Sequence, residues 1–174
     1  AMTSRLGFHY TGIDPNTQTH RGLEALGELC NSLRLGRGFE MHNIPSEQFK
    51  PEAESYDAAF SSPPYFNLET YCDEPTQCMN NFSNINDWFE GYVTPTLEMI
   101  FLALRKEGVY AVNIADYKAD KTEFEIVDRW KDISKQVGFK FVEQVDMLLN
   151  VRPGVGNNKD QNSFKSEGIY IFQK

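Results

Sequence analysis

The first third of the chain alternates between extended and helical patterns of apolar residues. Residues 8–13 (FHYTGI) are aromatic or β-branched and run into Asp14-Pro15-Asn16, so they predict a strand followed by a turn. From 19 to 35 the apolar side chains recur at helical spacing, and glycines close the segment. The pattern therefore predicts a strand and then an amphipathic helix.

The next segment predicts two short strands and a long loop. Residues 39–43 and 56–60 are apolar enough for strands, and the second strand ends at Ser61-Ser62-Pro63-Pro64, where two prolines forbid a central strand from continuing. Residues 66–85 show no periodicity, which predicts a loop of about 20 residues, a length that is usually functional.

The second half predicts a long helix, a buried strand, another helix and two final strands. The long helix is capped by Asn86 or Asp87, has Trp88 and Phe89 in its core, is kinked at Pro95 and ends at Gly108. The elements after it are a strand at 109–114, a helix at 124–137 and strands at 139–151 and 168–172.

This order of elements predicts an α/β fold. Strands that alternate with helices favour a sheet covered by helices, and two final strands joined without a helix favour an antiparallel hairpin at one edge. With 174 residues, of which 40% are hydrophobic and 13% aromatic, we expect one globular domain over 1–174.

Composition narrows the functional classes. No apolar run is long enough to cross a bilayer and the N-terminus does not resemble a signal peptide, so we expect a cytoplasmic protein without membrane contact. Three cysteines and three histidines show no metal-ligand spacing, which predicts free thiols and no metal site. A net charge of −8 predicts weak nucleic-acid binding by this chain alone.

Candidate chemistry lies at Ser62-Pro63-Pro64-Tyr65, directly after a predicted strand. A Pro-Pro step lacks amide donors, so its carbonyls are available as acceptors, while the serine oxygen adds another acceptor and the tyrosine adds a flat stacking face. Such a set suits a planar ring with an exocyclic amino group. Taken without context, the same residues would be a turn that ends a strand.

The sequence resembles the amino-methylating DNA methyltransferases that use S-adenosylmethionine. DAAFSSPPYF matches their motif IV, (D/N/S)PP(Y/F), and YTGIDPN is similar to their motif II at the end of the second strand. KSEGIYIFQK is similar to their last edge strand, so the resemblance covers Gly7 to Lys174. It implies a Rossmann-like class I methyltransferase sheet with helices on both faces and a C-terminal antiparallel hairpin.

The resemblance also implies roles for the motif. Ser62, Pro63, Pro64 and Tyr65 are the expected catalytic residues, with the Ser62 hydroxyl and the Pro63 carbonyl accepting hydrogen bonds from the target amine. Tyr65 stacks on a base flipped out of the DNA duplex, and catalysis is mainly positioning. The amine is N4 of cytosine or N6 of adenine, and the sequence leaves both open.

Further residues are expected to bind the cofactor and the base. Asp14 and Asn16 are the expected contacts to S-adenosylmethionine, and an Asx turn is the alternative role for Asp14. Phe66 and Tyr71 are expected to stack on bases. Asp116, at the end of a predicted strand, either lines the pocket or caps the next turn.

Two parts of the family's cofactor site are not found. Its glycine-rich loop should precede the strand at 8–13, and residues 43–46 contain no carboxylate for the adenine amine. We therefore expect a domain truncated before its second strand, lacking the first strand, which binds cofactor weakly and needs a complementing polypeptide for activity. The alternative is a non-catalytic remnant or binding module that keeps the fold.

The absence of the family's first strand leads us to expect that the protein forms an oligomer or pairs with another chain. In the family it lies between the strands that end here at Asp14 and Ser62, so its absence leaves two open strand edges. These strands either pair directly or accept a strand from another chain, and a symmetric homo-oligomer would cover the edges and the exposed helix faces.

Overall fold

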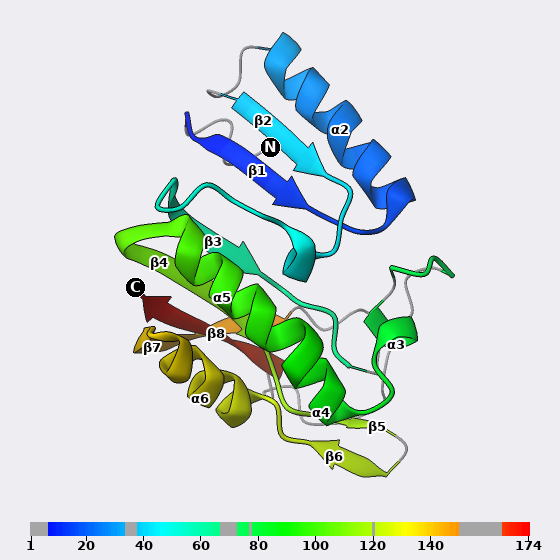
Figure 1. Ribbon diagram of the computed structural model, residues 1–174, viewed down its shortest axis with the longest axis vertical. Coiled ribbons are helices and arrows are strands. Elements are labelled where there is room, and N and C mark those ends of the chain that lie inside the picture. The colour runs from blue at the N-terminus through cyan, green and yellow to red at the C-terminus, as the bar shows by residue number, and fades with distance from the viewer. Residues whose placement is uncertain (1–6, 34–37, 67–72, 77, 120, 150–164) are drawn as a thin grey trace. The chain divides into compact units, whose positions relative to one another are not determined.

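A computed structural model describes residues 7–33, 38–66, 73–76, 78–119, 121–149 and 165–174 (Figure 1). The chain divides into two compact units, and each combines two separate stretches of sequence. Unit 1 comprises residues 1–50 and 66–96, and unit 2 comprises residues 51–65 and 97–174. The predicted α/β class, with open mixed sheets and helices, is confirmed.

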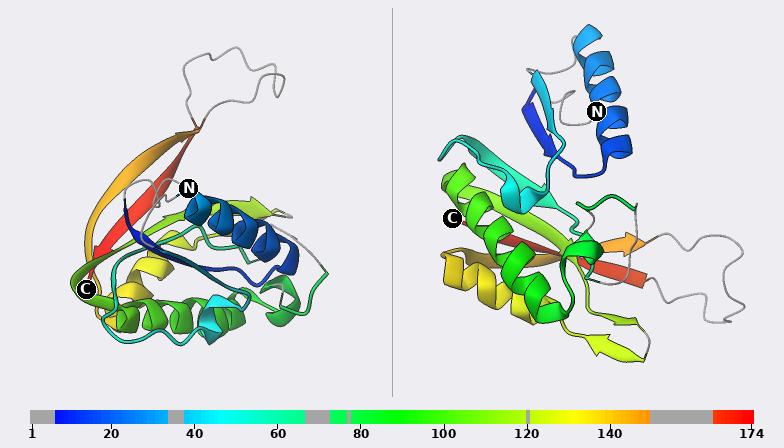
Figure 2. Two further views of the ribbon diagram at one scale, coloured as in Figure 1. Left: turned by 90° about the horizontal axis from the view of Figure 1, so that it is seen from above. Right: turned by 45° about the vertical axis from the view of Figure 1, so that its right-hand side comes forward.

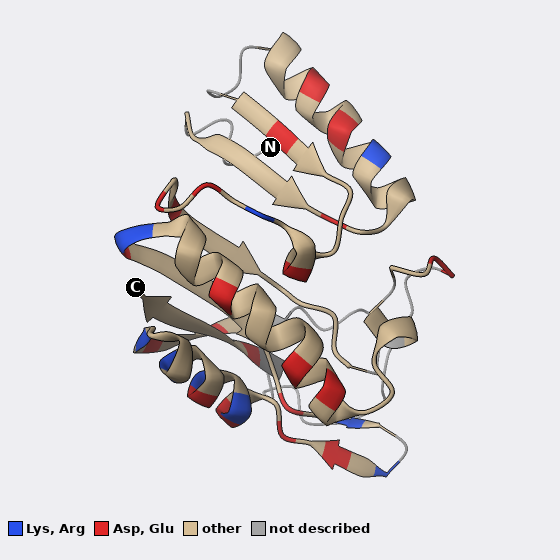
Figure 3. Cartoon of the chain, in the orientation of Figure 1, with Lys and Arg blue, Asp and Glu red and all other residues tan. Residues whose placement is uncertain are grey.

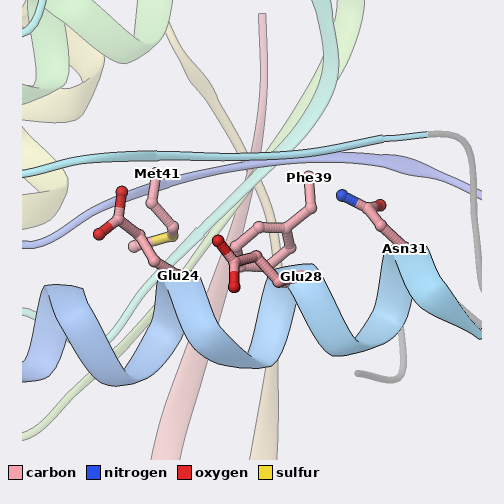
Figure 4. Close-up of a pocket in the computed structure, with 6 residues that line it drawn as sticks. Glu24, Glu28, Asn31, Phe39 and Met41 are labelled. Carbon is pink, nitrogen blue, oxygen red and sulfur yellow. The ribbon is translucent and has the colours of Figure 1, made fainter.

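Unit 1 begins with a parallel strand pair. Strand β1 (His9–Ile13) lies beside β2 (Gly38–His42) in a register that pairs His9 with Gly38, and helix α2 (Thr17–Ser32) forms the crossover. Phe39 and Met41 of β2 point toward α2, as Figure 4 shows. Parallel strands need such a crossover connection, so the predicted strand and helix order is confirmed here.

The rest of unit 1 contains short helical segments. They are η1 (Ser46–Gln48), α3 (Cys78–Asn81), α4 (Ile85–Trp88) and the π-helical turn η2 (Phe89–Val93). Trp88 and Phe89 are buried as predicted, and their ring centroids lie 4.9 Å apart. The first cap was predicted wrongly: Asn84, not Asn86 or Asp87, accepts from the amides of both of those residues.

The helix predicted to kink at Pro95 contains a π-helical turn just before the proline. The π turn at Phe89–Val93 separates α4 from α5 (Thr94–Ala103), and Thr94 Oγ1 donates to the Phe89 carbonyl at 2.9 Å. A proline has no amide hydrogen for the i→i−4 bond, so a widened turn preceding it is an expected adjustment.

Unit 2 is built on a four-stranded mixed sheet in the order β3-β4-β8-β7 (Figure 2). Strand β3 (Tyr56–Ser61) runs parallel to β4 (Leu104–Ile114), whereas β8 (Lys165–Gln173) runs antiparallel to both β4 and β7 (Lys140–Leu149). The predicted C-terminal antiparallel hairpin is therefore confirmed.

Helices α5 and α6 (Val127–Val137) lie on the same face of this sheet (Figures 1 and 2). Tyr110 and Phe172 stack beneath them with ring centroids 5.9 Å apart, and Trp130 of α6 is fully buried. This aromatic core anchors β4, and the carboxyl end of β4 carries several residues of the site described below.

Two boundaries in unit 2 differ from the sequence prediction. Helix α5 ends at Ala103 rather than at Gly108, because the carbonyls of Leu102 and Ala103 accept hydrogen bonds from the amides of Glu54 and Ser55. Residues 117–124 form a small antiparallel hairpin, β5 (Tyr117–Ala119) and β6 (Thr122–Phe124), so the predicted helix at 124–137 begins at Val127.

Strands β1 and β3 belong to different sheets. Within the described residues β1 pairs with β2 and β3 pairs with β4, and each has no other strand neighbour. Each of the two strands therefore leaves one edge unpaired within the described part of the chain.

Candidate functional site

The predicted amine-binding residues directly follow the carboxyl end of β3. Ser62 is exposed, Pro63 is buried, and Pro64 and Tyr65 are half-buried. Buried Pro63 fixes the turn, because its ring restricts φ to about −65°. The serine hydroxyl is thereby presented at the carboxyl end of a parallel strand, where α/β folds place their ligands.

The Ser62 side chain has a hydrogen-bond partner on the neighbouring strand. Its Oγ lies 3.5 Å from Oδ1 of Asn113, and Nδ2 of Asn113 donates to the carbonyl of Gly168 at 3.2 Å. Asn113 is buried on β4 and its amide orientation is fixed by Gly168. Because its oxygen faces Ser62, the hydroxyl of Ser62 is the donor of that long contact, and the lone pairs of Oγ stay available as acceptors.

Tyr65 is held at both ends of its side chain. Its hydroxyl oxygen accepts a hydrogen bond from the amide of Ala115 at 2.9 Å, and its ring contacts that of Tyr117 at a centroid distance of 5.2 Å. Both partners come from the residues just after β4. The carboxyl end of β4 thus contributes to the placement of Ser62 and of Tyr65.

Asp116 is a capping residue. Its Oδ1 accepts hydrogen bonds from the amides of Ile126 and Val127, at 2.7 and 2.9 Å. The capping interpretation is confirmed, although Asp116 caps the start of α6 rather than the next turn of the chain.

The predicted ribose-binding residues lie in unit 1, at the carboxyl end of β1. Oδ1 of Asp14 accepts from the amide of Asn16 at 2.9 Å, which is the geometry of an Asx turn. Oδ1 of Asn16 accepts from the amide of Thr19 at 2.9 Å and so caps α2. Burial and the charge of Asp14 raise the pKa of the Tyr10 phenol.

Side chains distant in sequence stabilise this turn. Asn43, after β2, donates its amide hydrogens to the carbonyls of Asp14 and Pro15 at 3.2 and 3.0 Å. Glu74 accepts hydrogen bonds from the amide and the hydroxyl of Thr17, at 3.3 and 3.0 Å, in the first turn of α2. A carboxylate at a helix N-terminus is stabilising, so the hydrogen bonds of Glu74 stabilise the turn that leads into α2.

Glu47 is a carboxylate that the sequence analysis missed. It lies in η1, one residue beyond the stretch 43–46 in which a carboxylate was sought. Its Oε2 is buried and has no hydrogen-bond partner among the described residues. Burial raises the pKa of Glu47, and its own backbone amide partly offsets this effect. A search extended by one residue would have found it.

Cys78 lies in the same unit as Glu47. The indole Nε1 of Trp88 donates to its Sγ at 3.1 Å, and burial raises the pKa of the thiol to about 12, with a smaller rise from the charge of Glu47. Cys30 and Cys78 are free cysteines, and the raised pKa keeps Cys78 a thiol at neutral pH.

Of the two residues predicted to stack on bases, the structure describes Phe66. Phe66 is half-buried, whereas Tyr71 lies outside the described residues.

Within the described ranges no group of three or more His, Cys, Asp or Glu side chains could hold a metal ion. None of the helices described there is long and apolar enough to cross a membrane.

Unit 2 also carries basic residues, and unit 1 has a surface hollow. Lys and Arg residues of unit 2 occur along α6 and at the start of β4, and acidic residues lie between them on α6 (Figure 3). The hollow between α2 and β2 contains none of the predicted site residues (Figure 4). Its lining residues are Glu24, Gly27, Glu28, Asn31, Phe39 and Met41.

Comparison with solved structures identifies the fold. An S-adenosylmethionine-dependent methyltransferase from Methanosarcina mazei superposes with a TM-score of 0.60 and 12% identity, over 99% of this chain and 85% of that one. A candidate DNA modification methylase from Thermus thermophilus superposes with a TM-score of 0.51 and 15% identity, over 95% of this chain. The chain spans about half, 54%, of that methylase, which has also been crystallised with S-adenosyl-L-methionine.

The same fold also occurs in an enzyme of another reaction class. The [4+2]-cyclase SpnF superposes with a TM-score of 0.59 and 9% identity, over 96% of this chain and 67% of that one. No family model and no curated protein sequence matches the chain. The chain thus has the Rossmann-like fold of class I S-adenosylmethionine-dependent methyltransferases.

Proposed function

We propose that this protein transfers a methyl group from S-adenosylmethionine to the exocyclic amine of cytosine (N4) or adenine (N6) in DNA. The observation that carries the proposal is the turn at Ser62–Tyr65, with an exposed hydroxyl and an anchored tyrosine at the carboxyl end of β3. A candidate DNA modification methylase is among the solved structures with this fold, which supports DNA as the substrate class.

Three acceptor groups of unit 1 fit S-adenosylmethionine. Asp14 and Asn16 follow β1, and their side-chain oxygens, which also accept main-chain amides of the turn and of α2, are the proposed acceptors for ribose hydroxyls. Glu47 offers a buried oxygen without a partner in the described structure, which an adenine amine would satisfy. When bound, S-adenosylmethionine supplies an electrophilic methyl carbon on its sulfonium sulfur.

The motif residues orient the nucleophilic amine. Ser62 Oγ and the Pro63 carbonyl accept hydrogen bonds from its two N–H groups, so the lone pair of the nitrogen points away from both oxygens and is free to attack a methyl carbon. The contact of Ser62 with Asn113 directs the serine hydrogen away from the substrate. These residues therefore lower the barrier by orientation, without a covalent intermediate.

Tyr65 supplies the stacking face for the base. An amine paired inside a duplex cannot reach the methyl donor, so the base must leave the helix and be held by stacking. The net charge of −8 weakens binding to the DNA backbone, which makes stacking and hydrogen bonding to the base the principal local contacts.

The test combines binding and product analysis. Isothermal titration measures S-adenosylmethionine binding, and mass spectrometry of digested nucleosides detects N4-methylcytosine or N6-methyladenine after incubation with mixed-sequence oligonucleotides. We expect Ser62→Ala to lower kcat by about 10- to 100-fold, with a smaller effect on cofactor affinity.

Ser61→Ala is the matched control. Ser61 is the adjacent serine on β3, and successive strand side chains point to opposite faces, so its loss should leave the turnover unchanged. Methyl transfer that persists in Ser62→Ala at the native rate would contradict the assigned chemistry.

The second candidate function is a binding module that keeps the fold without transferring methyl groups. The cyclase neighbour supports it, because this fold also hosts other chemistry. Saturable binding of S-adenosylmethionine or DNA without any methylated nucleoside would favour this alternative.

We also propose that the protein self-associates through its unpaired strand edges. β3 carries only one charged side chain, Asp57, which is paired with Arg105, whereas the outer strand β7 carries Lys140, Glu143 and Asp146. Charged edge strands resist pairing, so β3 is the better edge for a second copy of the chain. A separate complementing polypeptide is the alternative occupant of this edge.

A further inference from the structure

The small hairpin after β4 contacts the tyrosine of the SPPY turn. In β5–β6, Tyr117 pairs with Phe124, and their rings stack at a centroid distance of 4.9 Å with planes inclined by 12°. The ring of Tyr117 also meets that of Tyr65, at 5.2 Å and an inclination of 47°. Three rings thus form a continuous row from the hairpin to the turn.

Hydrogen bonds between side-chain oxygens and main-chain amides hold the two residues before Tyr117. The amide of Ala115 donates to the hydroxyl oxygen of Tyr65, and Asp116 binds the first amides of α6. Residues 115 and 116 are therefore held between the turn and helix α6, which fixes the point on the chain from which the side chain of Tyr117 extends.

We propose that Tyr117 is a positioning residue, which holds the ring of Tyr65 in the plane needed for stacking on a flipped base. This inference rests on the proposed function. The physical reason is pre-organisation: a tyrosine ring that is already fixed loses less conformational freedom when a planar ligand binds to it. Phe124 acts one step further away, because it supports Tyr117 through the nearly parallel stack.

The proposal requires the ring of residue 117 and not its hydroxyl. Tyr117→Phe keeps the ring, whereas Tyr117→Leu keeps apolar volume and removes the aromatic contact. Phe124→Leu is a second variant that leaves Tyr117 in place but removes its support. Lys118→Ala, an exposed position in the same hairpin, is the matched control.

The first measurement needs no substrate. Protein labelled with 3-fluorotyrosine is studied by fluorine NMR, and the Tyr65 signal is assigned by its loss in Tyr65→Phe. We expect Tyr117→Leu to move this signal toward that of free fluorotyrosine, Phe124→Leu to move it less, and Tyr117→Phe and Lys118→Ala to leave it in place. A Tyr65 signal that Tyr117→Leu does not move would overturn the proposal.

The second measurement is steady-state methylation of DNA. We expect Tyr117→Leu to raise KM for DNA about two- to tenfold with little change in kcat, the range expected for one aromatic pair. The double variant Tyr65→Leu/Tyr117→Leu should be no worse than Tyr65→Leu, because the two residues act as one unit. Additive losses would contradict the positioning role.

The two measurements separate failure of this inference from failure of the proposed function. Absence of methyl transfer by the native protein contradicts the proposed function, while the fluorine signal of Tyr65 still tests its contact with Tyr117. A native KM in Tyr117→Leu with an active enzyme contradicts the inference alone.

Discussion

At the scale of single residues, burial of the Glu47 carboxylate lowers the free energy of unfolding. Glu47 places a carboxylate oxygen where neither solvent nor a described hydrogen-bond donor reaches it. Such a group opposes folding in its charged form, because an unpaired ionised oxygen loses hydration without compensation. A ligand could satisfy such an oxygen, which is why we propose Glu47 for cofactor binding.

Glu47→Gln should therefore stabilise the free protein and weaken cofactor binding. Burial raises the pKa of Glu47 in the folded state, so its unfavourable contribution is fully present above that pKa, declines as the pH falls below it and is gone below the pKa of the unfolded chain. We expect the variant to gain up to about 1 kcal/mol in unfolding free energy at pH 7. Its affinity for S-adenosylmethionine should fall about tenfold.

Urea denaturation at pH 7 and pH 4 and calorimetric titration measure these effects. The gain in stability should shrink toward pH 4, where the native carboxyl group is also protonated. Glu28→Gln, an exposed carboxylate on α2, serves as the control and should change neither quantity. Loss of stability at pH 7 in Glu47→Gln would refute this account of the buried oxygen.

At the scale of elements, the local sequence predicts those strands and helices in which the apolar pattern repeats over several residues. The strand at β1, the crossover α2 and the hairpin β7–β8 were predicted because each has several residues of consistent alternation or helical spacing. The hairpin at 117–124 was missed, since strands of three residues are too short to show a period.

Long-range hydrogen bonds account for the other errors. Helix α5 ends where the amides of Glu54 and Ser55 donate to its last carbonyls. The sequence of the helix itself gives no indication of these partners. The same limit applies to the site: the SPPY turn was predicted from its own residues, but Ala115 and Tyr117 were not. The Tyr65 hydroxyl and the Ala115 amide belong to residues 50 positions apart.

The contact between α2 and β2 gives a prediction at this scale. Gly27 is buried on α2, and a methyl group there would overlap the ring of Phe39. We expect Gly27→Ala to lower the unfolding free energy by about 1–3 kcal/mol, because an overpacked contact must displace the ring or the helix. Equilibrium urea denaturation measures the change.

Gly22 provides a matched comparison on the same helix. No heavy atom lies within 4 Å of a methyl group added there, so Gly22→Ala should raise stability by about 0.5–1 kcal/mol through helix propensity alone. Equal effects of the two substitutions would mean that α2 does not lie against Phe39 as described.

For the whole molecule, the net charge opposes self-association, whereas the unpaired strand edge favours it. The net charge of −8 repels a second copy, whereas the unpaired edge of β3 and its exposed Phe60, 67% accessible, favour association. Because the Debye length falls from about 10 Å at 0.1 M salt to about 3 Å at 1 M, salt should weaken the repulsion and leave the strand pairing intact.

Multi-angle light scattering over a concentration series should therefore show the 20.0 kDa chain forming dimers more readily as the salt concentration rises. Phe60→Ser should shift this equilibrium toward the monomer. Val142→Ser, which removes an exposed apolar side chain from the opposite outer strand β7, should leave it unchanged. A species that stays monomeric at high protein and high salt would exclude self-association, and recovery of dimers in Phe60→Ser would exclude the β3 surface.

The interleaved composition of the two units has a consequence for synthesis on the ribosome. Strand β3 emerges early, but its partner β4 follows only after residues 66–96, which belong to the other unit. At about 5–20 residues per second the intervening chain takes several seconds to appear. During that interval Phe60 and its strand have no native neighbour, so nascent chains of this protein should depend on chaperones that shield apolar strands.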